Sequence, residues 1–118
     1  MIHKITIHNW RPAAINTLMR SHWSTPGKLK KADANMIAAY AMIDSIPKAT
    51  GKRRVSLEIT LTGRQRQVDP DSYQKSTLDG LVKCGQLLDD NAASVEWGCV
   101  WYSRIGEAGT TIILTDMD

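Results

Sequence analysis

Hydrophobic and polar residues alternate along two segments of the chain, and this alternation predicts β-strands. In residues 2–8, Ile5 and Ile7 fall on one side of an extended backbone, and Lys4 and Thr6 fall on the other. In residues 55–62 the alternation is longer, and its apolar members are Val55, Leu57, Ile59 and Leu61. Each segment is therefore expected to form a strand with one buried face and one wet face.

Two further strands are predicted near the end of the chain. A third strand is expected from residue 95 onward, with one face made of Val95, Trp97, Cys99 and Trp101. The β-branched run at residues 110–114 predicts a fourth, because β-branched side chains favour the extended backbone. The glycine-bounded stretch at 106–109 is expected to be the hairpin loop between them.

A different period, with apolar residues three and four positions apart, predicts a helix that ends before Pro47. The hydroxyl and proline residues at Ser24, Thr25 and Pro26 are typical of a helix start. The stripe expected to face the core consists of Ala32, Met36, Ala39, Ile43 and Ile46, widened by Ile37 and Tyr40.

A second, shorter helix is predicted from about residue 72 to residue 84. Asp71 is placed to cap its first turn, and Gln74 three residues later would complete a capping box. Gly85 is a typical C-terminal stop. The apolar stripe of this helix is expected to be Leu78, Leu81 and Val82.

The order of these elements is β-α-β-α-β-β, which predicts the α/β fold class. We expect a small sandwich of one mixed four-stranded sheet with two helices on one face. At 118 residues the chain has room for one domain, residues 1–118.

Composition narrows the class of protein. Hydrophobic residues make up 42% of the chain, which is typical of a globular domain, and the net charge of +3 permits a polyanionic partner without requiring one. Cys84 and Cys99 lack the spacing of a disulfide framework or a metal site and are expected to be buried thiols. Without a signal pattern or an apolar run long enough to span a bilayer, a cytoplasmic protein with no membrane partner is expected.

Charged side chains that could take part in catalysis are most concentrated between residues 69 and 90. Five carboxylates and one lysine fall within 22 residues: Asp69, Asp71, Lys75, Asp79, Asp89 and Asp90. Carboxylates held together repel one another unless a cation compensates, and Mg²⁺ prefers oxygen ligands. Magnesium held by carboxylates commonly serves phosphate chemistry, so an acidic group on a mildly basic chain indicates a metal-dependent enzyme that acts on nucleic acid.

Spacing places some of these residues near one another. Asp69 and Asp71 point the same way on an extended backbone, and Lys75 lies one helical turn after Asp71. Whether Asp90 reaches them does not follow from spacing. Simpler roles stay open as well, with Asp71 as a helix cap, Lys75 as a surface partner of Asp79, and Asp89–Asn91 as a turn.

The run from Asp69 to Asp90 resembles the signature of RusA-type Holliday junction resolvases, the crossover junction endodeoxyribonucleases of bacteria and their phages or prophages. The likeness implies that Asp69, Asp71 and Asp90 are metal-binding catalytic aspartates and that Lys75 is a catalytic lysine. Asp79 and Asp89 would be secondary acidic residues. It also implies Mg²⁺, with Mn²⁺ as an alternative, a homodimer, and a role in DNA recombination and repair.

Three departures from the family pattern affect this expectation. Ser72 stands where the family usually has asparagine, and Gln67 and Val68 stand where RusA has arginines. The stretch 91–95 is about one residue longer than in the family. The metal ligands are all present, whereas two phosphate contacts are expected to be missing.

The expected function is therefore a Mg²⁺-dependent endodeoxyribonuclease. It would resolve four-way DNA junctions by paired nicks, through attack of a metal-activated water on a phosphodiester. The alternatives are an inactive DNA-binding relative, a nuclease for flaps or forks, and a small structural domain. The basic residues expected to contact the DNA backbone, any of which could simply be solvated, are Arg11, Arg20, Lys52, Arg53, Arg54, Arg64 and Arg66.

Overall fold

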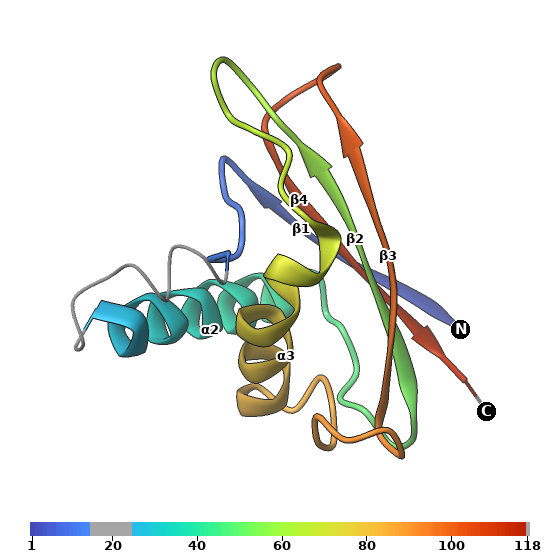
Figure 1. The fold of residues 1–118 in the computed structure, drawn as a ribbon. Helices are drawn as coiled ribbons and strands as arrows, with labels where there is room; N and C mark the ends of the chain where they lie inside the picture. Colours follow the sequence, from blue (N-terminus) through green and yellow to red (C-terminus); the bar gives the residue numbers. More distant parts are fainter. Residues whose placement is uncertain (15–24, 118) are drawn as a thin grey trace.

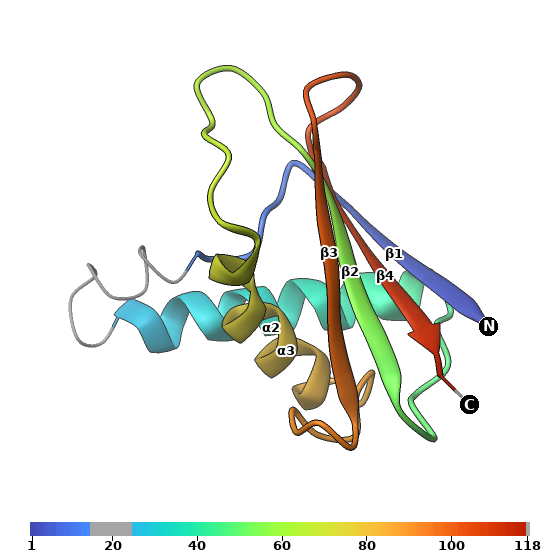
Figure 2. The same cartoon turned by 45° about the vertical axis from the view of Figure 1, so that its right-hand side comes forward.

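The computed structural model describes residues 1–14 and 25–117, and within these ranges a four-stranded sheet packs against two α-helices that lie on one of its faces (Figures 1 and 2). The elements are β1 (Ile2–His8), α2 (Thr25–Ile43), β2 (Arg53–Thr60), the short 3₁₀ helix η1 (Pro70–Tyr73), α3 (Gln74–Lys83), β3 (Val95–Ser103) and β4 (Gly109–Asp116). The predicted fold class is confirmed.

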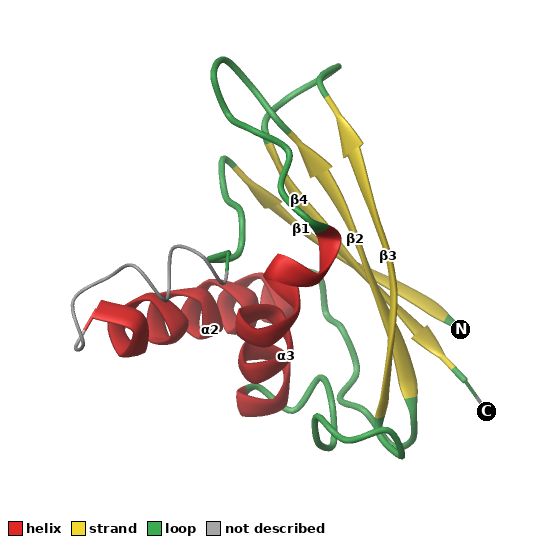
Figure 3. Ribbon diagram, viewed as in Figure 1, coloured by secondary structure: helices red, strands yellow, loops and turns green. Residues whose placement is uncertain are grey.

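The strands lie in the order β1-β4-β2-β3, and the sheet is mixed. β2 and β3 are parallel, whereas β4 runs antiparallel to both β1 and β2. A parallel pair needs a crossover connection, and η1 with α3 supplies it. The segment after β2 therefore leaves from one end of the sheet, and the segment after α3 returns to the other end (Figure 3).

The core follows the predicted alternation in β1, β2 and β4. The side chains that face the helices are essentially inaccessible to water: Ile5, Ile7, Val55, Leu57, Ile59, Ile112 and Leu114. Tyr73, Leu78, Leu81 and Leu87 from the crossover pack against them. Within the described residues, neither helix combines the length and the apolar character that a bilayer-spanning segment requires.

The predicted face of β3 is correct for Val95 and Trp97 and wrong beyond them, because a bulge interrupts the strand. Val55 pairs with Trp97, but Leu57 pairs with Val100, so β3 carries one extra residue between these pairs. Trp97 and Val100 therefore both pack against the core, whereas Trp101 is 51% exposed on the other face. Cys99, expected to be buried, is exposed for the same reason.

The predicted core stripe of α2 is correct only in part, because the helix is turned relative to it. Met36, Ile37 and Tyr40 pack in or against the core as expected, and so does Ile46 just after the helix. Ala34, Ile37 and Ala41 are buried, whereas Ala32, Ala39 and Ile43 are exposed. The second half of α2 is apolar almost all round, so its pattern does not define a single face. The close packing of α3 determines which face of α2 is buried. A Cβ on Gly80 of α3 would lie only 2.8 Å from Ile37 Cδ1 and 3.3 Å from the Cα of Ala34.

The start of α3 differs from the predicted capping box. Pro70 opens a 3₁₀ turn, which passes into α3 at Gln74, so Asp71 lies inside the turn instead of at an N-cap. Asp69 holds the N-cap position of η1, but its side chain makes no capping hydrogen bond. The predicted stop is confirmed, because Gly85 follows the helix with φ +80.

Candidate metal and nucleic-acid site

Asp69 and Asp71 lie together where the chain enters the crossover. The backbone of Asp69 is extended, with φ −54 and ψ 134, and Pro70 then starts the 3₁₀ turn. Both aspartates are exposed and line one open hollow together with Pro70 and Ser72. Ser72 and Tyr73 are buried beneath them, so the pair is held on an anchored turn.

The two carboxylates are available to a ligand. Among residues 1–14 and 25–117, no hydrogen bond or ion pair reaches the side-chain oxygens of Asp69 or Asp71. Magnesium is usually held by one or two carboxylates, with water and substrate phosphate completing its shell. The donor set of this pair therefore fits Mg²⁺, and the capping role considered for Asp71 is not observed.

Lys75 lies on the first turn of α3, one helical turn after Asp71. Its side chain is exposed and forms no hydrogen bond or ion pair with another described residue. Asp79 is half-buried one turn further along α3. Lys75 is thus free to approach a phosphate that lies at the aspartate pair.

Asp90 lies at the other end of the sheet from this pair. The Tyr102 hydroxyl, near the end of β3, reaches the carbonyl of Val68, whereas Asp90 precedes the start of β3. A nine-residue strand is roughly 30 Å long at about 3.3 Å per residue, so no single metal ion can bridge the two ends within one chain. Accordingly, no group of three or more His, Cys, Asp or Glu residues in the described structure is placed to hold a metal ion.

The loop that carries Asp90 is itself ordered by short-range contacts. Asp89 accepts hydrogen bonds on Oδ1 from the Asp90 amide at 2.8 Å and on Oδ2 from Asn91 Nδ2 at 3.2 Å. These bonds close a turn and leave Asp90 exposed at its tip. Asp89 therefore shapes the loop, and Asp90 presents its carboxylate outward.

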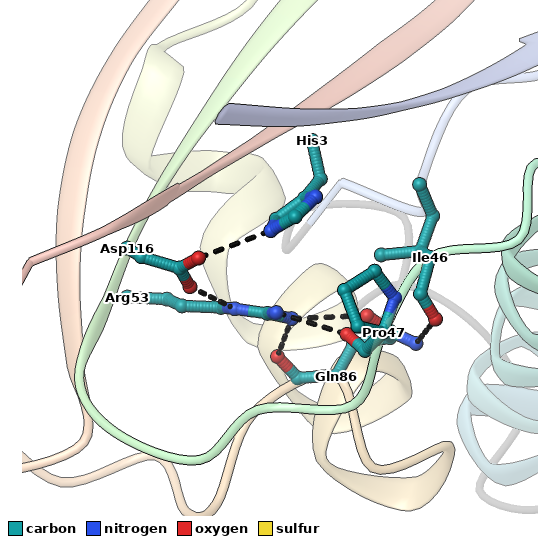
Figure 4. A network of polar contacts seen from close by, with 6 residues as sticks. All are labelled: His3, Ile46, Pro47, Arg53, Gln86 and Asp116. Atoms are coloured by element: carbon teal, nitrogen blue, oxygen red, sulfur yellow. Dashed lines mark hydrogen bonds and ion pairs between the residues drawn. The ribbon is translucent and has the colours of Figure 1, made fainter. Parts of the chain in front are cut away.

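Arg53 anchors the same end of the molecule and is not a DNA contact (Figure 4). Its side chain is 3% exposed, because the guanidinium is used internally. Nε donates to Asp116 Oδ1 at 2.8 Å, Nη1 to the carbonyl and Oε1 of Gln86 at 3.1 and 3.0 Å, and Nη2 to the carbonyl of Pro47 at 2.9 Å. The expectation that Arg53 binds phosphate is therefore corrected: it fastens the segment after α3 to β2.

Asp116, a half-buried residue at the end of β4, completes this network. Besides the bond from Arg53, it accepts a hydrogen bond on Oδ2 from His3 Nε2 at 3.0 Å. These donors, Arg53 before His3, hold the pKa of Asp116 below its ordinary value. The first and last strands are thus tied to the loop that leads to Asp90.

The remaining predicted basic residues divide between the two ends of the sheet. Lys52 and Arg54 lie at the start of β2, the end that also carries Asp90. Arg54 forms an ion pair with Glu96 on the neighbouring strand, and this bond lowers the pKa of Glu96. Arg20 lies outside the described residues.

The other end of the sheet gathers four arginines around the segment that leads to Asp69. Arg11 Nη1 donates to the carbonyl of Arg66 at 3.2 Å, and Arg104 donates to the carbonyls of Gln65 at 2.6 Å and Gly63 at 3.5 Å. We call Arg11, Arg64, Arg66 and Arg104 the arginine group. Arg104 was missed in the sequence because it lies in the β3–β4 hairpin, about 40 residues away along the chain.

The three residues that depart from the family pattern differ in how exposed they are to solvent. Gln67 is exposed, so an arginine there would face solvent. Val68 is half-buried and packs against the core, so this position does not offer a phosphate contact in the present fold. Ser72 is largely buried under the aspartate pair, although it contributes to the lining of the hollow.

No protein-family model matches the chain, and no curated protein matches it. The likeness to RusA-type resolvases therefore rests on the motif from Asp69 to Asp90.

Proposed function

We propose that this chain is a Mg²⁺-dependent endodeoxyribonuclease that cuts branched DNA, four-way junctions included. The observation that carries the proposal is the pair of exposed, unengaged carboxylates at Asp69 and Asp71, with Lys75 one turn away. A turn that needed these residues only for its own stability would use the carboxylates as caps, and this one does not.

Each group has a distinct part in the proposed reaction. Asp69 and Asp71 hold the cation, and bound Mg²⁺ supplies Lewis-acid stabilisation and an activated water for attack on the phosphodiester. Lys75 places a positive charge beside the phosphate, where negative charge grows in the transition state. The arginine group holds the DNA backbone, which positions the strand without reading its sequence.

The separation of Asp90 from Asp69 and Asp71 supports a metal site that is shared between two subunits. Because Asp90 lies at the opposite end of the sheet from Asp69 and Asp71, one chain cannot bring all three to one ion. In a homodimer, Asp90 of the partner subunit can complete the pair. A twofold dimer then has two equal sites, which suits a reaction that nicks two strands of a roughly twofold junction.

Cleavage assays on defined substrates test this function. The purified protein is incubated with end-labelled four-way junction, flap and linear duplex, each with Mg²⁺, with Ca²⁺ or with chelator. We expect Mg²⁺-dependent nicks in branched DNA, little cutting of linear duplex, and binding without cutting in Ca²⁺. Binding to junctions without cleavage in Mg²⁺ or Mn²⁺ would overturn the nuclease and favour an inactive DNA-binding relative.

A further inference from the structure

A pocket of about 500 Å³ is lined by Val68 and Tyr73, which flank the segment that carries the aspartate pair. It lies between the segment after β1, one face of α2, residues 66–68 and the turn η1. Its walls are largely apolar, formed by Trp10, Pro12, Leu29, Met36, Val68 and Tyr73. Tyr73 is only 1% exposed, so the half-buried Trp10 is the aromatic side chain of this lining that can offer a ring face to a ligand. Arg11 and Arg66, two members of the arginine group, also line it. Tyr73 belongs to η1 together with Asp71, so the pocket and the proposed metal site share one turn.

The pocket is built from segments that are fastened to one another. Asp33 on α2 lines it and is only 6% exposed. Its Oδ2 accepts hydrogen bonds from the amide of Ala13 at 2.8 Å and from Ser76 Oγ on α3 at 2.6 Å. Arg11 donates to the carbonyl of Arg66, so two further lining residues are joined. These bonds hold the walls in place, so the pocket does not depend on a ligand for its shape.

The chemistry of the walls fits a nucleobase. Aromatic side chains bind bases by stacking, and arginines beside them hold the flanking phosphates. The volume lies within the range of pockets that take small ligands. We propose that this pocket receives one unstacked base of the strand whose phosphate lies at Asp69 and Asp71. The inference rests on the proposed nuclease function and adds how its substrate is recognised.

Such a pocket would favour branched DNA over linear duplex. A base must leave the helical stack to enter it, and this step costs least where stacking is already broken. Branch points offer such bases, whereas a linear duplex does not. The substrate would thus be selected by the ease of moving one base, in addition to the backbone contacts of the arginine group.

Filling the pocket tests the inference. Ala32 is an exposed residue of α2 that lines the pocket, so Ala32→Phe places a ring there without disturbing the core. Ala39 is exposed on the same helix two turns further along and away from the pocket, so Ala39→Phe is the matched control. Junction affinity is measured in Ca²⁺ for intact DNA and for a series in which each base near the cut is replaced in turn by an abasic residue.

The two variants should respond differently to base removal. For the wild type, loss of one particular base should weaken binding about fivefold or more, because stacking of that base is lost. Ala32→Phe should bind intact DNA as weakly as the wild type binds that abasic DNA, and base removal should then change its affinity less than about twofold. Ala39→Phe should behave as the wild type.

Other outcomes separate the pocket from the nuclease. If the wild type cuts junctions but no single base matters, or if Ala32→Phe loses as much affinity on base removal as the wild type, the pocket does not bind a base and the nuclease stands. If the wild type neither binds nor cuts DNA, both proposals fail.

Discussion

The hydroxyl of Tyr102 donates a hydrogen bond to the carbonyl of Val68, the residue before Asp69. This bond joins the far end of β3 to the segment that carries the aspartate pair. Burial, followed by the neighbouring Tyr73, raises the pKa of Tyr102, so the donor proton is kept. Together with the contacts of Arg104, it fixes a long polar segment that has little core of its own.

Tyr102→Phe should loosen this segment. We expect a loss of about 1 kcal/mol in the free energy of unfolding, because one part-buried hydrogen bond is removed and the carbonyl of Val68 loses its donor. Cleavage should fall while the fold is kept, since the aspartate pair is less firmly held. Denaturant unfolding and single-turnover cleavage measure the two effects. Tyr40→Phe, at a half-buried tyrosine of α2, is the control and should leave cleavage unchanged.

Asp71→Asn should abolish cleavage without weakening junction binding. The change removes one negative oxygen from the proposed metal site, and it also reduces repulsion of the phosphates. We expect cleavage to fall about 100-fold or more and affinity in Ca²⁺ to stay equal or rise. Unfolding should be unaffected, because the carboxylate makes no capping bond. Glu58→Gln, an exposed acid of β2, serves as control, and equal cleavage by both variants would remove Asp71 from the site.

Lys75→Ala should slow the chemical step more than it weakens binding. A cation beside the scissile phosphate acts mainly in the transition state, so a loss of roughly 10²–10³-fold in single-turnover rate is expected. Lys83→Ala changes an exposed lysine near the end of the same helix and should have little effect on the rate. If both variants lower affinity slightly and leave the rate intact, Lys75 is only a solvated surface residue.

Asp116→Asn should change the acid sensitivity of the fold. Because Arg53 and His3 lower the pKa of Asp116, its contribution to stability is full above the ordinary carboxyl value of about 4 and is lost as the pH falls through the lowered value. At neutral pH the variant should be less stable by about 2 kcal/mol, through loss of hydrogen bonds from a charged donor. Between about pH 5 and pH 2 it should lose less further stability than the wild type.

Denaturant unfolding at several pH values checks this behaviour of Asp116. Asp44→Asn is the control, because Asp44 is exposed and, among the described residues, its carboxylate accepts one backbone bond, from the amide of Thr6 at 3.2 Å. A parallel loss of stability with falling pH in wild type and Asp116→Asn would show that the network does not favour the charged carboxylate.

Local pattern was sufficient for much of the fold. Alternation in β1 and β2 identified Ile5, Ile7 and the apolar series from Val55 to Leu61, because burial of one sheet face imposes a period of two. It failed in β3, where the extra residue at the bulge reverses the sides of Cys99 and Trp101. It failed again on α2, where Asp33 is buried because distant Ser76 and the Ala13 amide donate to it.

The candidate site, like the fold, was predictable from local sequence only in part. The spacing from Asp69 to Lys75 predicted a local group, and the structure places these residues on one turn and the helix that follows it. The position of Asp90 depends on the direction of α3 and on the parallel pairing of β3 with β2, which no local pattern encodes. Arg53 and Arg104 are both arginines in a basic chain, and only tertiary contacts make one an internal anchor and the other a member of the arginine group.

A mixing experiment with Asp71→Asn and Asp90→Asn tests the central claim most directly. Each variant alone should be inactive on junctions. In a mixed dimer, one site carries both substitutions, and the other combines an intact aspartate pair with an intact Asp90. After subunit exchange at equal concentrations, half of the dimers are mixed, so Mg²⁺-dependent nicking should recover to about a quarter of the wild-type rate. The product should be a singly nicked junction. A mixture as inactive as its two parents, or an Asp90→Asn protein that cuts as well as the wild type, would contradict a metal site shared between two chains.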